Sequence, residues 1–171
     1  MSGPNYDHLR VLVIEDNAHM RSLLHSLLHA IGLKQVIETP DGASAFAALR
    51  DERPDLVLTD LDMRPMDGIE FTRKVRTDAD SPNPYLPIIM VTGHTELAKV
   101  IQARDAGVNE FLAKPITVRN LQSRLTQIIE RPRPFVRCTN YFGPDRRRRK
   151  DPEFRGPFRR EGDVADEVVF L

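Results

Sequence analysis

The sequence predicts an α/β domain built on a doubly wound parallel sheet. Five short β-rich apolar runs alternate with five stretches in which apolar residues recur at helical spacing. The run Ile88–Thr92 is nearly all apolar, which is typical of a central parallel strand covered on both faces. Five β–α alternations imply right-handed crossovers that place helices on both faces of the sheet.

The elements follow one another in a regular order along the chain. We expect strands at residues 9–14, 36–37, 56–59, 88–92 and 110–113. Helical spacing predicts helices from Met20 to Ile31, from Gly42 through Leu49, from Ile69 to Val75, from about Glu96 to Ala106, and from Leu121 to Ile129. The cluster Glu15-Asp16-Asn17 is suited to capping the first helix, and Gly32 and Gly107 follow helix ends.

Charge divides the chain into parts. Residues 1–130 carry 14 Lys and Arg against 18 Asp and Glu, whereas residues 131–160 carry 11 against 3 and residues 161–171 carry none against 4. We therefore expect an N-terminal lead at 1–8, a domain at 9–130, and a Pro-, Arg- and aromatic-rich tail at 131–171. Prolines are frequent in the tail, which predicts an irregular C-terminal extension.

The composition also indicates a compartment. The single Cys138 excludes an internal disulfide and fits a reducing cytosol. No apolar run approaches the length of a membrane span, and the first residues lack the charged and apolar regions of a signal peptide. We expect a cytoplasmic protein with no membrane partner.

Charged and polar side chains stand just past four of the predicted strands. Glu15 and Asp16 follow the first, Asp60 the third, Thr92 ends the fourth and Lys114 follows the fifth. Ligands of such sheets bind at the carboxyl ends of the strands, so these side chains are predicted to meet. Three carboxylates call for a hard cation with oxygen ligands, and Mg²⁺ fits better than Zn²⁺ because no Cys or suitably placed His joins them. A carboxylate held in this way can act as a nucleophile toward phosphorus.

Four segments resemble response-regulator receiver domains of two-component signalling. They are Val11–Asp16, Pro54–Gly68, Ile89–Gly93 and Gly107–Pro115. The resemblance covers residues 9 to 130 and implies the flavodoxin-like fold with strand order 2-1-3-4-5. It also implies a phosphoacceptor signalling domain that catalyses only its own phosphorylation and dephosphorylation.

The same resemblance assigns roles to individual residues. It implies that Asp60 accepts the phosphoryl group, and that Lys114 and Thr92 contact it. It implies a Mg²⁺ cofactor held by Asp60, by Asp16 directly, by Glu15 through water and by the backbone carbonyl of Asp62. Thr92 and Phe111 hold the positions of the switch pair.

Two positions in the loop after Asp60 depart from the usual pattern or add charge. Arg64 stands where the family usually has Pro, and Pro65 comes next, so we expect an altered loop path around an intact site. The carboxylate of Asp62 can overhang the phosphoryl group. It would either slow phosphorylation by repulsion or help to orient a hydrolytic water.

The resemblance implies a histidine kinase or histidine phosphotransferase upstream and an unknown protein downstream. An alternative is a nucleic-acid-binding regulator that uses the basic tail, including Arg146, Arg147, Arg148 and Arg149, because arginines interleaved with aromatics suit phosphates and stacked bases. Further alternatives are a phosphate sink and, more remotely, a haloacid-dehalogenase-type phosphatase. The segment Asp60-Leu-Asp62 resembles the nucleophile motif of such phosphatases. We also expect the basic tail to dock on the acidic domain.

Overall fold

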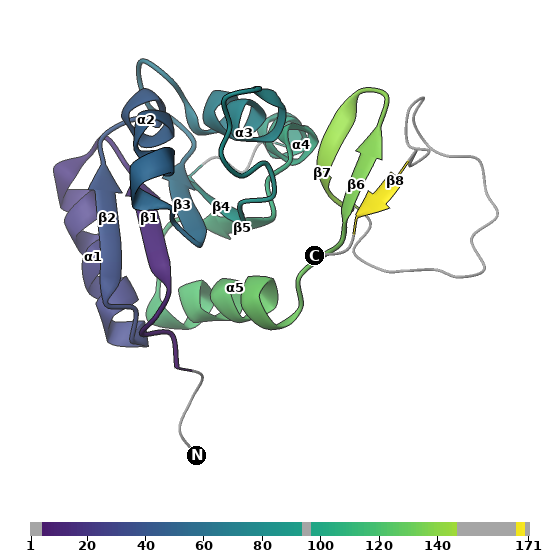
Figure 1. Cartoon of the computed structure of the whole chain (residues 1–171). Helices are drawn as coiled ribbons and strands as arrows, with labels where there is room; N and C mark the ends of the chain where they lie inside the picture. Colours follow the sequence, from purple (N-terminus) through teal and green to yellow (C-terminus); the bar gives the residue numbers. More distant parts are fainter. Residues whose placement is uncertain (1–4, 94–96, 147–166, 170–171) are drawn as a thin grey trace.

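The computed structural model describes residues 5–93, 97–146 and 167–169, and its main feature is a five-stranded parallel sheet (Figure 1). The strands are β1 (Arg10–Ile14), β2 (Gln35–Thr39), β3 (Leu56–Asp60), β4 (Ile88–Thr92) and β5 (Glu110–Ala113). Their order is β2-β1-β3-β4-β5 and every neighbouring pair is parallel. The predicted fold class and strand order are confirmed.

Five helices cover the two faces of this sheet. They are α1 (Ala18–Ile31), α2 (Gly42–Glu52), α3 (Gly68–Thr77), α4 (Leu97–Ala106) and α5 (Val118–Glu130). Helices α1 and α5 share one face and α2 and α3 the other, with α4 beside α3 (Figure 1). The expected start of the fourth helix at Glu96 lies outside the described residues.

The core consists of two apolar layers, one on each face of the sheet. Leu24 and Leu28 of α1 and Leu121 and Leu125 of α5 pack on one face, and all four are fully buried. Phe71 of α3 belongs to the cluster on the other face. Strands β3 and β4 are buried along their whole length, as the apolar runs predicted.

Polar caps begin the helices next to the functional edge of the sheet. The side chain of Asn17 accepts a hydrogen bond from the amide of Met20 at 3.0 Å and so starts α1. Asp67 and Glu70 form a reciprocal capping box at the start of α3. The cap Asn17 lies three residues beyond the end of β1, and the cap Asp67 lies seven residues beyond the end of β3.

The prediction of an irregular C-terminal extension is wrong for residues 135–144. These residues form an antiparallel hairpin of β6 (Phe135–Cys138) and β7 (Tyr141–Pro144), and β8 (Glu167–Val169) pairs with the other side of β6. The sheet order β7-β6-β8 makes β7 an edge strand. Pro144 ends this edge strand, and Pro132 and Pro134 precede β6, so the prolines interrupt no central ladder of hydrogen bonds.

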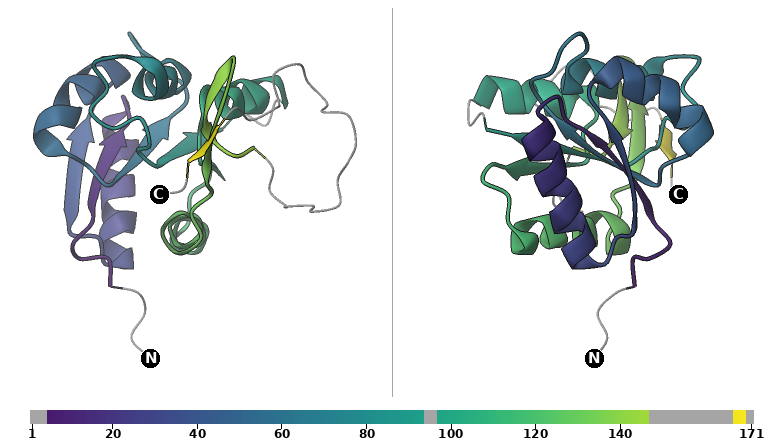
Figure 2. Two further views of the ribbon diagram at one scale, coloured as in Figure 1. Left: turned by 45° about the vertical axis from the view of Figure 1, so that its right-hand side comes forward. Right: turned by 90° about the vertical axis from the view of Figure 1, so that its left-hand side faces the viewer.

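The hairpin packs against the side of the domain where α3 and α4 lie (Figures 1 and 2). The rings of Phe135 and Phe142 contact Tyr85 of the α3–β4 loop, each with centroids 5.2 Å from it. Arg146 pairs with Asp105 of α4 at 3.0 Å. The expected docking of the tail is therefore present in its described part, whereas Arg147, Arg148 and Arg149 lie outside the described residues.

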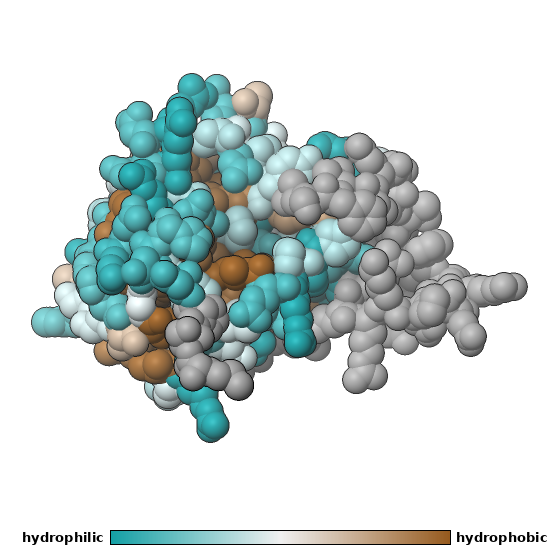
Figure 3. All heavy atoms as spheres, turned by 60° about the horizontal axis from the view of Figure 1, so that its bottom comes forward, coloured by the Kyte–Doolittle hydropathy of each residue, from teal (hydrophilic) through white to brown (hydrophobic). Residues whose placement is uncertain are grey.

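The outer surface of the domain is dominated by polar and charged side chains. In the view of Figure 3 the apolar areas are small and lie between hydrophilic ones. Among the described residues, Leu23, Val118 and Ile129 are the large apolar side chains that are exposed. None of the described helices combines the length and the apolar character that spanning a bilayer requires.

Candidate functional site

Three carboxylates meet at the carboxyl ends of two adjacent strands. Glu15 and Asp16 follow β1, and Asp60 is the last residue of β3. One oxygen from each side chain lies within 4.8 Å of those of the other two. Glu15 is 1% exposed and Asp60 6% exposed, whereas Asp16 faces solvent. The parallel pairing of β1 with β3 places these side chains together, as the sequence predicted.

Lys114, which follows β5, bonds directly to this cluster. Its Nζ lies 2.9 Å from Oδ1 of Asp60 and 3.8 Å from Oε2 of Glu15. Burial would lower the pKa of Lys114, but the bond to Asp60 and the charges of Asp60 and Glu15 raise it above its usual value. The ammonium is therefore charged at neutral pH and aimed at the carboxylate of Asp60.

The carboxyl groups remain short of positive charge even with Lys114 in place. Burial, together with the charge of Asp60, raises the pKa of Glu15 to about 7. Burial also raises the pKa of Asp60. Oε2 of Glu15 is buried and accepts no hydrogen bond from the described residues. An unsatisfied buried oxygen among acidic groups fits a hard divalent cation, whose charge would favour the ionised forms.

The loop that follows Asp60 folds back tightly over the end of β3. The amide of Asp62 donates to Oδ2 of Asp60 at 3.2 Å, and the amide of Gly68 donates to the carbonyl of Leu61 at 3.0 Å. A Cβ on Gly68 would lie 2.3 Å from the carbonyl oxygen of Asp60, closer than any side chain can approach. Glycine at position 68 therefore lets α3 begin against the strand that carries Asp60.

Thr92 and Phe111 lie on the two strands beyond β3. Thr92 is buried at the end of β4, and its carbonyl accepts a hydrogen bond from the amide of Lys114 at 3.0 Å. Phe111 is half-buried on β5, beside Met90 in the register, and packs against an apolar cluster that includes Ala103 of α4. The structure thus places the two residues on adjacent strands, while their switching role stays a prediction.

Comparison with known proteins identifies the family. The family model for the response regulator receiver domain matches residues 11–126. The chain belongs to this family. Two similar proteins are the chemotaxis protein CheY-3 of Vibrio cholerae, 33% identical over 124 residues, and the chemotaxis protein CheY of Pseudomonas aeruginosa, 34% identical over 123. Each alignment covers 72% of this chain, and 94% and 98% of the respective relative.

Solved structures of receivers superpose on the same part of the chain. A putative response regulator of Chloroflexus aurantiacus has a TM-score of 0.66 at 26% identity and covers 72% of this chain and 98% of its own. The receiver domain of a Pseudomonas aeruginosa sensor histidine kinase has a TM-score of 0.62 at 28% identity, with coverage of 70% and 95%. That structure is described with a magnesium ion coordinated in its active-site cleft. These matches lend no support to the haloacid-dehalogenase alternative.

The sequence does not single out Lys99 of α4, but its side chain reaches the loop that follows β3. Nζ of Lys99 lies 3.3 Å from Oδ1 of Asp62. Lys99 stands seven residues beyond the end of β4 and has no strand-end position to single it out. The direction of α4 relative to the sheet is what brings the side chain of Lys99 to the loop after β3.

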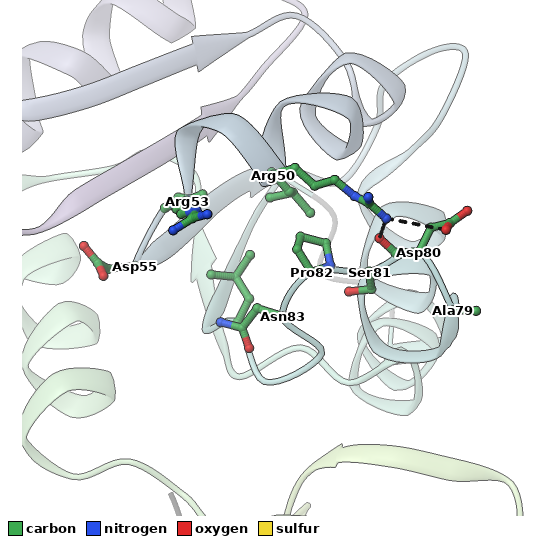
Figure 4. Close-up of a pocket in the computed structure, with 11 residues that line it drawn as sticks. Arg50, Arg53, Asp55, Ala79, Asp80, Ser81, Pro82 and Asn83 are labelled. Carbon is green, nitrogen blue, oxygen red and sulfur yellow. Dashed lines mark hydrogen bonds and ion pairs between the residues drawn. The ribbon is translucent and has the colours of Figure 1, made fainter.

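A separate cavity of about 700 Å³ lies on the receiver away from the acidic cluster (Figure 4). Its walls come from the C-terminal end of α2, the residues before β3 and the α3–β4 loop, and include Arg50, Arg53 and Asp80. Arg50 donates to the backbone carbonyl of Asp80 at 3.2 Å, shown as a dashed line in Figure 4. Its guanidinium is thus engaged with the cavity's own wall, and we assign the cavity no ligand.

Proposed function

We propose that this receiver takes a phosphoryl group on Asp60 from a histidine kinase or a histidine phosphotransferase and passes the signal to a partner protein. The observation that carries the proposal is the 2.9 Å contact between Lys114 and an Asp60 carboxylate that shares its pocket with Glu15 and Asp16. A carboxylate with a cationic partner in an acidic pocket is suited to nucleophilic attack on phosphorus.

The transfer step follows from the position of Asp60. One carboxylate oxygen of Asp60 attacks the phosphorus of phosphohistidine, a new O–P bond forms and the P–N bond breaks. The electron pair of the broken bond returns to the imidazole nitrogen, and the product on this chain is an acyl phosphate. Lys114 then lies within reach of the phosphoryl oxygens, and the hydroxyl of Thr92 contacts them from the end of β4.

Glu15, Asp16, Asp60 and the backbone carbonyl of Asp62 would hold Mg²⁺, with Glu15 acting through water. The ion supplies positive charge that stabilises the equatorial oxygens of the transferring group. The magnesium described in the receiver of the P. aeruginosa sensor kinase supports this assignment. So does the unsatisfied Oε2 of Glu15.

We propose that the output is a population shift read by another protein. Contact of Thr92 with the phosphoryl group would change the space next to Phe111, which already packs against α4. The similarity to chemotaxis proteins of V. cholerae and P. aeruginosa supports a protein partner. A nucleic-acid partner has less support, because the described arginine of the basic run, Arg146, is paired with Asp105.

The proposal is tested by labelling with a small phosphodonor and Mg²⁺. Intact-mass measurement should show one added phosphoryl group on the wild type and none on Asp60→Asn. The matched control Asp55→Asn, which removes an exposed carboxylate at the opposite end of β3, should label like the wild type. Undiminished labelling of Asp60→Asn would sink the assignment.

A further inference from the structure

We propose that Lys99 is a positioning residue that speeds phosphorylation of Asp60 by neutralising the carboxylate of Asp62. The inference rests on the proposed function of Asp60 and assigns a role to the acidic residue two positions beyond it. The geometry that points to it is the ion pair between Lys99 of α4 and Asp62 in the loop that carries the phosphoacceptor.

Asp62 is close enough to Asp60 for its charge to oppose phosphorylation. Its backbone amide donates to Oδ2 of Asp60 at 3.2 Å, so the two residues share one short turn. Burial is the main cause that raises the pKa of Asp60; the hydrogen bond from the Asp62 amide lowers it, and the carboxylate charge of Asp62 is a smaller cause that raises it. An incoming phosphoryl group brings further negative charge to the same place, and like charges at this range repel.

Lys99 reduces that repulsion in two ways. Its ammonium offsets part of the charge of Asp62, and the contact at 3.3 Å holds the carboxylate toward α4. Lys114 cannot do this work, because its Nζ bonds Asp60 on the other side. The two lysines therefore have separate tasks, with Lys114 on the phosphoacceptor and Lys99 on its acidic neighbour.

The expected size of the effect follows from the exposure of the pair. The Lys99 side chain is 37% exposed and that of Asp62 54% exposed, so solvent screens their interaction. Exposed ion pairs of this kind change an equilibrium or a rate by roughly two- to fivefold. Added salt should reduce the effect further.

The experiment measures the rate at which acetyl phosphate labels the protein in the presence of Mg²⁺. A carboxylate oxygen of Asp60 attacks phosphorus, the P–O bond to the acetyl group breaks, and acetate leaves with the electron pair. Four full-length proteins are compared: the wild type, Lys99→Met, Asp62→Asn and the double variant. Lys99→Met should label about two- to fivefold more slowly than the wild type at low salt, and the double variant should label like Asp62→Asn.

Controls separate this role from general charge and from folding. Lys74→Met removes a lysine of α3 that is likewise paired with an aspartate, Asp78 at 3.8 Å, and should label at the wild-type rate. Lys99→Arg keeps the positive charge and should restore most of the rate. Thermal unfolding of each variant checks that the fold is intact.

Two outcomes would overturn the inference while leaving the proposed function standing. Equal rates for Lys99→Met and the wild type would show that Lys99 does not speed phosphorylation through Asp62. An equal loss in the presence and absence of Asp62 would show that Lys99 acts on the phosphodonor itself. A wild type that takes no label at all would instead refute phosphorylation of Asp60, and the inference with it.

Discussion

Glu15 is the residue whose ionisation the fold opposes most clearly at the acidic site. It is 1% exposed, its Oε2 accepts no hydrogen bond from the described residues, and burial raises its pKa from 4.5 to about 7. Asp16 next to it faces solvent. Neighbouring carboxyl groups of the same strand end thus meet different environments.

The raised pKa of Glu15 predicts how stability depends on pH. Between about 4.5 and about 7 the folded protein binds more protons at this group than the unfolded chain, so the free energy of unfolding falls as pH rises through that window. Glu15→Gln should remove this part of the pH dependence, measured by chemical unfolding without Mg²⁺. Glu130→Gln, at the exposed end of α5, is the control and should keep it.

Magnesium should oppose this loss of stability with rising pH in the wild type. Because the ion binds the ionised carboxylates, it should raise the melting temperature more at pH 8 than at pH 5. Asp16→Ala should lose most of that rise. An equal rise in Asp16→Ala and the wild type would argue against direct ligation by Asp16.

At the scale of elements, the β6–β7 hairpin is attached to the receiver through a buried arginine. Arg76 of α3 is 3% exposed and donates to the carbonyls of Pro84, Leu86 and Gly107. Burial lowers its pKa to about 9, so it remains charged at neutral pH. The ring of Phe135 lies over its guanidinium, 5.0 Å from the ring centroid. The hairpin therefore packs against the hydrogen-bonded guanidinium of Arg76 as well as against an aromatic ring of the receiver.

This attachment predicts a large effect from loss of one hairpin ring. Phe142 is 7% exposed and packs against Tyr85 and Phe135. Phe142→Ala should lower the free energy of unfolding by about 3 kcal/mol. The measurement is denaturant unfolding, with Thr139→Ala at the exposed hairpin turn as a control expected to stay within about 0.5 kcal/mol. A small effect of Phe142→Ala would mean that the hairpin contributes little to the stability of the receiver.

At the scale of the whole molecule, the C-terminal segment that includes the hairpin contacts two elements of the receiver, α4 and β5. Arg146 pairs with Asp105 of α4 and lies over the ring of Tyr141, while Arg133 contacts the carbonyl of Asn109 and pairs with Glu110 of β5 at 3.7 Å. Helix α4 and strand β5 are also the elements that carry Lys99 and Phe111. We expect a change at the acidic site that moves either element to affect the hairpin.

We therefore predict that a phosphoryl mimic alters hydrogen exchange in residues 133–146. Beryllofluoride with Mg²⁺ should change the protection of these amides in the wild type, because their anchors lie on α4 and β5. Asp60→Asn should show no change when the mimic is added. Identical exchange in the wild type with and without beryllofluoride would rule out this coupling.

Much of the fold and of the candidate site could be predicted because the signals are local. Strands β4 and β5 have their expected bounds, and β3 extends the expected run by one residue, since buried parallel strands are short apolar runs. The predicted strand at 36–37 is shorter than β2, because β2 lies at the sheet edge. Val36 and Ile37 are its two apolar residues, and both are partly buried. The four segments that resemble the receiver family could be recognised because each has charged or polar side chains directly after an apolar strand.

The sequence by itself determined the alternation of strands and helices, the side chains that meet at the acidic edge, and the receiver family. Only the tertiary structure decided that residues 135–144 form a docked hairpin and that Lys99 reaches Asp62. The reason is the range of the interactions. Strand runs and helix caps depend on residues a few positions apart, whereas hairpin docking and the Lys99–Asp62 pair join segments tens of residues apart. Such contacts depend on how whole elements pack, which no local pattern specifies.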